Sequence, residues 1–510
     1  MDWTSGYVAD IGYTYGYYTE LNPLRVKLAF LNANLVCPDM GHACELGFGQ
    51  GMSTNLHAAA SLTQWHGTDF NPAQAGFAQE LATVAESGAR LFDEAFADFA
   101  ARADLPEFDY IGLHGIWSWI SDDNRAVIVD FVRRKLKVGG VLYISYNTMP
   151  GWAAFAPMRH LMTEHAEVIG AAGSGIVSRV GGALDFAEKL VAVNPSFTRA
   201  NPQIAERLAK VKAQDPHYLA HEYFNRDWHP MHFSTMAEWL AAGKLEFACS
   251  ANYFDHLDAI NLTREQQVFL KEIPDAMFRE SVRDFMVNQQ FRKDYWVKGA
   301  RKLSTFDQIE ALRAQRVMLM TTRAEVSLKV NGALGEATMT EAIYAPILDC
   351  LADHKTKTLG QIERALKDSG VSFAQLVQSV FLLAGGGQVA AVQDEAAIGK
   401  AKKRTDKLNL YLMNKARGGN QINYLASPVT GGGIAMGRFQ QLFMLALSLG
   451  RKQPAEWADF VWQLLVAQGQ KIVKDGVTLE SAEDNLAELT MQANDFAQKQ
   501  LPIVRALQIV

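Results

Sequence analysis

The sequence predicts an α/β protein with a doubly wound parallel sheet and at least one further domain, and three observations support this fold class. Apolar segments that end at Glu45 and Asp69 are each followed by a segment with helical periodicity, as in βαβ units. Three glycines at alternate positions, Gly47, Gly49 and Gly51, separate the first apolar segment from its helix. The 510 residues exceed what one hydrophobic core comfortably organises, so two or three domains are expected.

The glycine turn is the most informative stretch, and residues 42–51 read HACELGFGQG. Glycine adopts positive φ and lets a ligand approach the backbone, and the helix expected over residues 52–60 begins with unpaired N–H donors. Dinucleotide-binding folds space their glycines as G-x-G-x-x-G, whereas this turn reads G-x-G-x-G. A glycine turn alone is often a structural bend, so the ligand-binding interpretation depends on the next strand.

The second strand, expected over residues 64–69, ends at Asp69, 18 positions after Gly51. At about this distance in βαβ units, a carboxylate binds a ribose diol. We therefore predict that a cofactor contacts the three glycines together with Glu45, Asp69 and Phe70. The E-x-G-x-G-x-G turn and the acidic strand end resemble the class I S-adenosylmethionine-dependent methyltransferases. The resemblance implies a Rossmann-like sheet of seven strands, S-adenosylmethionine as cofactor and S-adenosylhomocysteine as product.

The chain before the glycine turn is rich in tyrosine, with four tyrosines in the six positions 13–18, and a helix is expected over residues 24–35. Tyrosine offers a flat apolar face with a polar tip, so this tyrosine arm could cover the cofactor or the acceptor. In that interpretation Tyr15 and Tyr18 contact the cofactor. A packed N-terminal arm without a binding role is the equal alternative.

The third strand and its exit are predicted over residues 89–96, after a helix over residues 72–87. Proline at position 72 is tolerated in the first turn of that helix. The exit carries Asp93 and Glu94. The resemblance to class I methyltransferases implies that an acidic residue here contacts the adenine amine, and the sequence leaves open which of the two does so.

The fourth and fifth strands are expected over residues 108–114 and 141–147, on either side of a helix over residues 122–136. Ligands of doubly wound sheets lie beyond the carboxyl ends of the strands. The residues at these two strand ends are therefore predicted to surround the transferred methyl group and its acceptor, and His114 is also counted as a cofactor contact. They are His114, Trp117, Trp119, Tyr146 and Asn147.

Longer motifs narrow the resemblance. The stretches ELGFGQG, FDYIGLHGIWSW and SYNTMPGW, with the tyrosine arm, are similar to bacterial methyltransferases that carry a methyltransferase regulatory domain. That group includes bacterial, rickettsial-type protein lysine methyltransferases of outer-membrane proteins. Residues 221–224, 291–298 and 425–429 resemble the same group, so the similarity covers nearly the whole chain. Phe48 departs from the pattern, because a cysteine is frequent there, which should change packing around the cofactor and not its binding.

A helical stretch over residues 153–230 follows the fifth strand, where the usual order would return to the sheet. We interpret it as an insertion over the acceptor side of a methyltransferase domain that spans residues 1–300. A helix over residues 233–242 and strands over residues 245–254 and 291–298 then complete the sheet.

The insertion and its exit contain candidate metal ligands, which are His217, His221, Glu222, His229 and His232. His217 and His221 would share one face of a helix, but nearby prolines indicate irregular chain. Methyl transfer in the class that the sequence resembles needs no metal. We therefore expect a hydrogen-bonded polar cluster and no metal, and residues 221–223 are an alternative lining for the acceptor channel.

Residues 301–400 predict a winged-helix-like regulatory or middle domain. Its expected elements are a strand over residues 325–330, a hairpin turn at Asn331-Gly332, helices over residues 340–351, 359–367 and 373–383, and a short wing over residues 385–391. The helices carry few basic residues, so a protein-contact or structural role is favoured over DNA binding. The basic run at residues 400–404 predicts a solvated linker, and residues 401–510 a helical C-terminal domain.

Composition limits the partners and the location. A net charge of -6 argues against a nucleic-acid partner. Four scattered cysteines indicate neither a disulfide framework nor a zinc site, which fits a cytoplasmic protein. No apolar run approaches the ~20 residues that span a bilayer. We expect a protein substrate, no nucleic acid and no membrane span, and leave a homodimer open.

These features predict an S-adenosylmethionine-dependent methyltransferase, and most directly a protein-lysine N-methyltransferase that transfers the methyl group in line to a deprotonated amine. An apolar, aromatic pocket lowers the pKa of an ammonium group, and aromatic faces hold the cationic product. Two alternatives remain open from the sequence. One is a small-molecule methyltransferase, and the other is an S-adenosylmethionine-binding interaction protein without catalysis.

Overall fold

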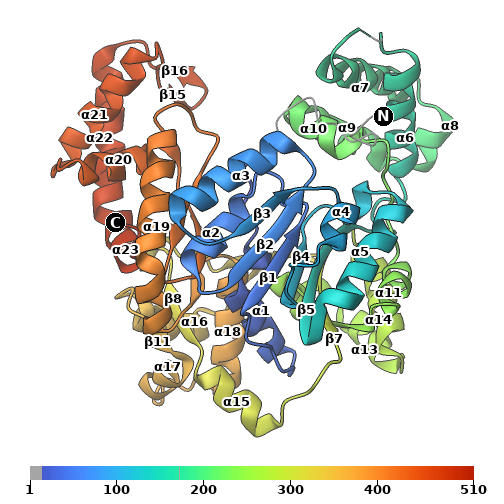
Figure 1. The fold of residues 1–510 in the computed structure, drawn as a ribbon, viewed down its shortest axis with the longest axis horizontal. Coiled ribbons are helices and arrows are strands. Elements are labelled where there is room, and N and C mark those ends of the chain that lie inside the picture. Colours follow the sequence, from blue (N-terminus) through green and yellow to red (C-terminus); the bar gives the residue numbers. More distant parts are fainter. Residues whose placement is uncertain (1–13, 172) are drawn as a thin grey trace.

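The computed structural model describes residues 14–171 and 173–510, and its centre is a seven-stranded sheet (Figure 1). The strand order is β3-β2-β1-β4-β5-β7-β6, in which β7 is antiparallel to both neighbours and the other pairs are parallel. The strands are β1 (His42–Leu46), β2 (Gln64–Asp69), β3 (Arg90–Asp93), β4 (Phe108–Leu113), β5 (Leu136–Asn147), β6 (Leu245–Ser250) and β7 (Phe291–Lys298). The predicted seven-stranded doubly wound sheet is confirmed.

Alternating side chains of the central strands fill a core on each face of the sheet. Ile111 and Ile144 belong to the core on one face, and their chain neighbours Tyr110 and Tyr143 belong to the core on the other, because successive strand side chains point to opposite faces. The first face is covered by α4 (Phe96–Ala101), α5 (Asp122–Lys135) and α11 (Phe233–Ala241), and the second by α1 (Pro23–Asn32).

Local sequence signals explain where two helices beside the predicted site begin. Asn71 caps α3 (Pro72–Ala85), because its side-chain oxygen accepts the backbone N–H of Ala73 at 3.0 Å. Ser121 caps α5 in the same way through the N–H of Asn124. Each cap satisfies a donor that the helix itself cannot pair. Both helices follow the carboxyl end of a strand, β2 for α3 and β4 for α5.

The segment between β5 and β6 is helical, as predicted, and has a hydrophobic core of its own that includes Trp152, Phe155, Met162 and Leu184. Figure 1 shows these insertion helices and the C-terminal helices as two lobes on opposite sides of the sheet. The insertion helices are α6 (Ala156–Val168), α7 (Ile176–Ala192), α8 (Ser196–Ala200), α9 (Gln203–Lys212) and α10 (Pro216–Tyr223). Between β6 and β7 lie η3 (Tyr253–His256), α12 (Asp258–Asn261), α13 (Arg264–Glu272) and α14 (Ala276–Val287).

A second, smaller unit follows β7 and contains a three-stranded sheet in the order β11-β8-β12. Its helices and strands are α15 (Thr305–Arg313), β8 (Arg316–Leu319), β9 (Lys329–Gly332), β10 (Gly335–Thr338), α16 (Glu341–Leu351), β11 (Lys357–Thr358), α17 (Leu359–Ala365), α18 (Phe373–Gly385) and β12 (Val389–Val392). The three expected helices are present, and the winged-helix comparison stays a prediction.

The hairpin turn predicted at Asn331-Gly332 is wrong. Both residues lie within β9, and Ala333 and Leu334 make the turn to β10. Gly332 is required for a different reason, because a Cβ there would lie 2.2 Å from the carbonyl oxygen of Ile260. Close approach of two chain segments, and not turn geometry, therefore accounts for this glycine.

The basic run at residues 400–404 is not a linker. It lies inside α19 (Glu395–Lys415), which packs against α2 (Met52–Ala60) and α3, and Arg404 donates a hydrogen bond to the carbonyl oxygen of Ser61. The domain boundary predicted at residue 400 consequently falls within a helix.

The C-terminal region is helical but also contains two hairpins. Its elements are β13 (Tyr424–Ser427), β14 (Gly432–Ala435), α20 (Arg438–Ser448), α21 (Pro454–Ala467), β15 (Val473–Lys474), β16 (Val477–Thr478), α22 (Ala482–Asp495), η5 (Phe496–Gln500) and α23 (Leu501–Ala506). Within residues 14–171 and 173–510, no helix is both long and apolar enough to cross a membrane.

Candidate functional site

A cavity of about 390 Å³ lies at the carboxyl ends of β1, β2 and β4, where the sequence predicted a ligand. Its volume is in the range of sites for organic ligands. The walls come from the tyrosine arm, the glycine turn, the exits of β2, β3 and β4, the start of α5 and the segment after α10. The predicted site residues that line it are Tyr18, Gly47, Gly49, Gly51, Asp69, Phe70, Glu94, His114 and Trp119.

The glycine turn needs its glycines for two separate reasons. Gly47, Gly49 and Gly51 have φ values of 70°, 57° and 68°, which L side chains rarely adopt. In addition, a Cβ on Gly47 would lie 2.5 Å from Cδ1 of Ile116, and one on Gly51 would lie 2.4 Å from Cβ of Ala78. The turn forms part of the cavity wall, with Phe48 and Gln50 between its glycines.

Asp69 holds the glycine turn from the neighbouring strand. Its Oδ2 accepts the N–H of Gly49 at 2.8 Å, and its Oδ1 accepts the N–H of Asn71 at 2.9 Å. Burial raises the pKa of Asp69 to about 6, although the two N–H donors oppose this rise. Each carboxylate oxygen retains a further lone pair, so the side chain can also accept two hydroxyl donors from a ribose.

Glu45 lies behind the glycine turn and is not part of the cavity lining. The hydroxyl of Thr54, on α2, donates a hydrogen bond to Oε2 of Glu45. Burial raises the pKa of Glu45 to about 8, and the nearby carboxylate of Asp69 adds to the rise. The structure places Glu45 where it fastens α2 to the end of β1.

His114 lies between two tyrosine rings. The ring of Tyr18 stacks on the imidazole with a centroid distance of 3.4 Å, and the hydroxyl of Tyr143 is hydrogen-bonded to Nδ1 at 2.8 Å. Removal from water lowers the pKa of His114 to about 3, so the ring is neutral near pH 7. A neutral ring held on both faces suits a positioning role better than that of a base.

A buried ion pair fastens the tyrosine arm to the sheet. Nζ of Lys293 lies 2.6 Å from Oε1 of Glu20. Burial alone would raise the pKa of Glu20, but nearby positive charges, first among them Lys293, lower it to about 2. The main-chain oxygen of Glu20 also accepts the hydroxyls of Tyr110 and Tyr295 at 3.2 and 2.7 Å. These bonds hold Tyr18 over His114.

The wall opposite the glycine turn combines an aromatic ring with charged side chains. Trp119 comes from η2 (Trp117–Trp119), Asp123 from the first turn of α5, and Arg226 and Asp227 from the segment after α10. Nη2 of Arg226 lies 3.4 Å from Oδ2 of Asp227. The helical insertion therefore contributes directly to this wall.

Three residues predicted beside the acceptor lie behind the cavity and not in its wall. Trp117 is fully buried and donates its indole N–H to Sδ of Met231 at 3.3 Å. Tyr146 is buried on the core face of β5 and donates its hydroxyl to Oδ2 of Asp294 at 2.9 Å. Asn147 is also buried. Packing against α11 buries Trp117, and side-chain alternation along β5 directs Tyr146 into the core. The three residues therefore lie behind the wall.

Two predicted cofactor contacts also lie away from the cavity lining. Tyr15 packs edge-on against Phe77, with ring centroids 5.3 Å apart, and Asp93 is exposed. Glu94 lines the cavity, which favours it over Asp93 as the adenine contact. Tyr13, the first tyrosine of the predicted arm, lies outside the described residues.

The C-terminal region packs against the tyrosine arm and α2, which the sequence did not predict. A Cβ on Gly432 would lie 2.3 Å from the hydroxyl oxygen of Tyr17, so β14 approaches the tyrosine arm as closely as backbone can. Nδ1 of His57, on α2, is hydrogen-bonded to the carbonyl oxygen of Gly431 at 3.3 Å. The glycine run at 431–433 was the available signal, but its partners lie more than 370 residues away along the chain.

The cavity fits S-adenosylmethionine on two observations. Three glycines with positive φ bring backbone into the cavity wall, and Asp69 and Glu94 offer acceptors for a ribose diol and an amine. No three His, Cys, Asp or Glu side chains within residues 14–171 and 173–510 form a group that could hold a metal ion.

Comparisons with known proteins agree with this geometry. Residues 215–298 match the predicted methyltransferase regulatory domain. The Synechocystis protein sll1526 is 40% identical over 514 aligned positions, which cover 100% of both chains. The Rickettsia prowazekii protein RP789 is 28% identical over 194 positions, or 36% of this chain and 33% of that protein. PKMT2 from Rickettsia typhi, solved in complex with AdoHcy, shares the fold with a TM-score of 0.70 at 16% identity, over 98% of this chain and 100% of that chain.

Proposed function

We propose that this chain, which belongs to one family with the Synechocystis protein sll1526, is a class I S-adenosylmethionine-dependent methyltransferase with a methyltransferase regulatory domain, and that its acceptor is a lysine amine of a protein. S-adenosylmethionine is the cofactor and S-adenosylhomocysteine the product. The proposal concerns the acceptor, which must reach the wall opposite the glycine turn.

The charge and shape of that wall carry the proposal. Trp119, Asp123 and Asp227 all line the cavity, so an indole ring and two carboxylates are available to an acceptor there. Carboxylates attract a protonated amine from solvent, and an indole face stabilises the methylated cation. Arg226 in the same wall pairs with Asp227 at 3.4 Å, so the carboxylate of Asp123 and the indole ring are the groups that favour a cationic acceptor.

The mechanism requires the amine to lose its proton before it reacts. When the ammonium group moves from the carboxylates at the entrance towards Ile116 and Phe96, it leaves water, and its pKa falls. The proton passes to water, which leaves the nitrogen lone pair free to face the methyl group in line. S-adenosylmethionine, held by the glycine turn and Asp69, would supply that methyl group on a positively charged sulfur that can keep the bonding electron pair.

His114 and Tyr18 act in this scheme as positioning residues. A pKa of about 3 makes His114 a weak base, so the ring orients the reacting groups and does not remove the proton. The stacked Tyr18 ring closes the cavity on the side of the arm and helps to exclude water. Orientation and exclusion of water are the main contributions that such a displacement needs.

The test is incubation of the full chain with methyl-labelled S-adenosylmethionine and proteins from a bacterial lysate, followed by mass spectrometry. We expect additions of about 14 Da on lysine side chains. Trp119→Ala should slow the transfer by about a hundredfold, because it removes acceptor positioning, and should change cofactor affinity far less.

Trp119→Phe is the matched control, since it keeps an aromatic face, and it should retain most of the activity. Label found in small molecules but not in proteins would contradict the lysine proposal. Label in neither fraction would leave a protein that binds the cofactor without transferring its methyl group, and would also contradict it.

A further inference from the structure

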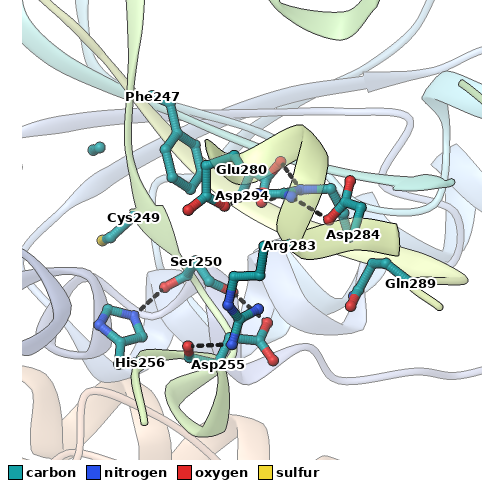
Figure 2. Close-up of a pocket in the computed structure, with 12 residues that line it drawn as sticks. Phe247, Cys249, Ser250, Asp255, His256, Glu280, Arg283, Asp284, Gln289 and Asp294 are labelled. Carbon is teal, nitrogen blue, oxygen red and sulfur yellow. Dashed lines mark hydrogen bonds and ion pairs between the residues drawn. The ribbon is translucent and has the colours of Figure 1, made fainter. Parts of the chain in front are cut away.

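A second cavity, of about 220 Å³, lies at the far end of the sheet, between β6, β7, η3 and α14 (Figure 2). Its lining residues fall between positions 247 and 294, inside the segment that matches the regulatory domain, and none of them lines the cofactor cavity. The proposed methyl transfer therefore assigns it no role.

Carboxylates outnumber cations in the wall of this second cavity. Figure 2 shows the carboxylates of Glu280, Asp284 and Asp294 gathered on one side and Asp255 on the other. Four carboxyl groups face two guanidinium groups, and burial lowers the pKa of His256, which keeps it neutral. Burial also raises the pKa of Asp294 and raises the pKa of Asp284 to about 7, so the excess of negative charge grows as the pH rises above 7. The charged residues of the lining are Asp255, Glu280, Arg283, Asp284, Arg292 and Asp294.

Arg292 is the centre of the charge cluster, and its donors are already committed. Its nitrogen atoms lie 2.9 Å from Glu280, 2.6 Å from Asp284 and 2.8 Å from Asp294. Asp284 uses only Oδ1 in this network. Its Oδ2 has no hydrogen-bond partner among the described residues, although the side chain is only 3% exposed. A buried carboxylate oxygen without a donor is costly, so this atom marks a position where a donor belongs.

We propose that this cavity binds an organic cation with N–H donors, namely an ammonium or guanidinium group on a short alkyl chain. The N–H groups donate to Oδ2 of Asp284 and to the half-buried carboxylate of Glu280, and the alkyl part lies against Phe247 and Ala248. The excess of carboxylates rejects an anion. A metal ion does not fit, because Arg292 lies among the three carboxylates and pairs with each, and no group of His, Cys, Asp or Glu side chains within the described residues could hold a metal ion.

The site also has a physical connection to the acceptor wall. Asp294, in the lining, accepts the hydroxyl of Tyr146, and the next residue, Asn147, donates its backbone N–H to Oγ of Ser118 at 2.8 Å. Ser118 directly precedes Trp119 in the wall of the cofactor cavity. A cation bound in the regulatory segment is thus linked to the acceptor side through a short run of hydrogen bonds.

The test is a ligand-observed NMR titration of the full chain with n-butylammonium and ethylguanidinium chlorides as free cations. The methylamides of acetyl-lysine and acetyl-arginine serve as models of protein side chains. We expect saturable binding that is about tenfold tighter than that of tetramethylammonium, which has no N–H donor. Binding of the free cations alone identifies a small amine as the ligand, and binding of the blocked amino acids as well identifies a protein side chain.

Asp284→Asn should weaken this binding by about tenfold and leave the affinity for S-adenosylhomocysteine unchanged. Glu280→Gln, at a side chain that is 27% exposed, provides a second variant if the first does not fold. Asp130→Asn is the matched control, because Asp130, like Asp284, pairs with arginine, but its side chain lies half exposed on α5. Absence of saturable binding by every probe, or equal binding by the wild type and both cavity variants, overturns the proposal.

Discussion

The two cavities at the carboxyl edge of the sheet are built in opposite ways. In the wall of the cofactor cavity, the backbone of the glycine turn is held by Asp69, which accepts the N–H of Gly49. Around the second cavity, charged side chains of β7, η3 and α14 form the wall together with uncharged residues of β6. Arg292 alone joins three carboxylates there.

This difference predicts which property a substitution changes at each cavity. A backbone cradle depends on a few glycines and on the strand that holds them, so a substitution acts mainly on ligand affinity. A buried charge network depends on mutual compensation, and removal of one partner leaves a charge without its counterpart. The largest effect on stability is therefore expected at the second cavity, and the largest effect on cofactor affinity at the first.

Arg292→Met should give the largest loss. It leaves Glu280, Asp284 and Asp294 without their common cation, and the free energy of unfolding should fall by about 3–5 kcal/mol. Equilibrium urea denaturation at pH 7 measures it. The control is Arg133→Met, at an exposed position of α5, for which a loss of about 0–1 kcal/mol in the free energy of unfolding is expected. Equal losses in the two variants would show that the buried charge network contributes no more to stability than an exposed ion pair does.

The cofactor-free protein should lose stability as the pH rises from about 4 to 6. Burial raises the pKa of Asp69 from 3.8 to about 6, so within this window the folded state binds more protons than the unfolded state. The stabilisation is complete below pH 4 and disappears as the pH passes 6, which amounts to about 3 kcal/mol at about 1.4 kcal/mol per pKa unit. Denaturation of the wild type and Asp69→Asn at pH 4 and 7 measures the difference. Identical pH dependence in the two proteins would refute it.

Asp69→Ala should weaken the binding of S-adenosylmethionine by about 1.5–3 kcal/mol, because it removes a charged acceptor and releases the N–H of Gly49. Titration calorimetry gives this value directly. Asp93→Ala, at an exposed residue outside the cavity lining, should leave the affinity unchanged. An unchanged affinity in Asp69→Ala would remove Asp69 from the site.

Gly51→Ala should cost about 1–3 kcal/mol more in the free energy of unfolding than Gly88→Ala. Both glycines have positive φ, at 68° and 76°, but a Cβ at position 88 meets nothing within 4 Å, whereas one at position 51 meets Ala78 at 2.4 Å. Comparison of the two variants therefore separates the cost of steric crowding from the cost of backbone strain. Matching losses would mean that the turn relaxes and that crowding contributes little.

The smallest effects are expected for two tyrosine hydroxyls of β5, those of Tyr143 and Tyr146, whose side chains lie on opposite faces of the sheet. Tyr146→Phe removes the donor to Asp294, and Tyr143→Phe removes the hydrogen bond to His114. Each should cost about 0.5–1.5 kcal/mol in urea denaturation, because the partner of each keeps other contacts. A much larger loss in Tyr146→Phe would place this hydroxyl at the centre of the charge network.

The sequence by itself determined the sheet and the ligand-binding turn. Strand and helix positions up to β5 agree with the expected ranges within a few residues, because hydrophobic periodicity and helix caps such as Asn71 are local properties. The glycine turn and Asp69 were predictable for the same reason, since a positive φ and an acidic strand end are both visible in a short stretch of sequence.

Only the tertiary structure decided which aromatic and charged residues face a cavity. Trp117 and Trp119 are two positions apart, yet one is fully buried and the other lines the cofactor cavity. The contact of Gly432 with Tyr17 and the assembly of α14 with β7 around Arg292 likewise join segments without any shared local pattern. Burial and charge compensation depend on which distant segments pack together, and this information is not contained in the neighbourhood of any single residue.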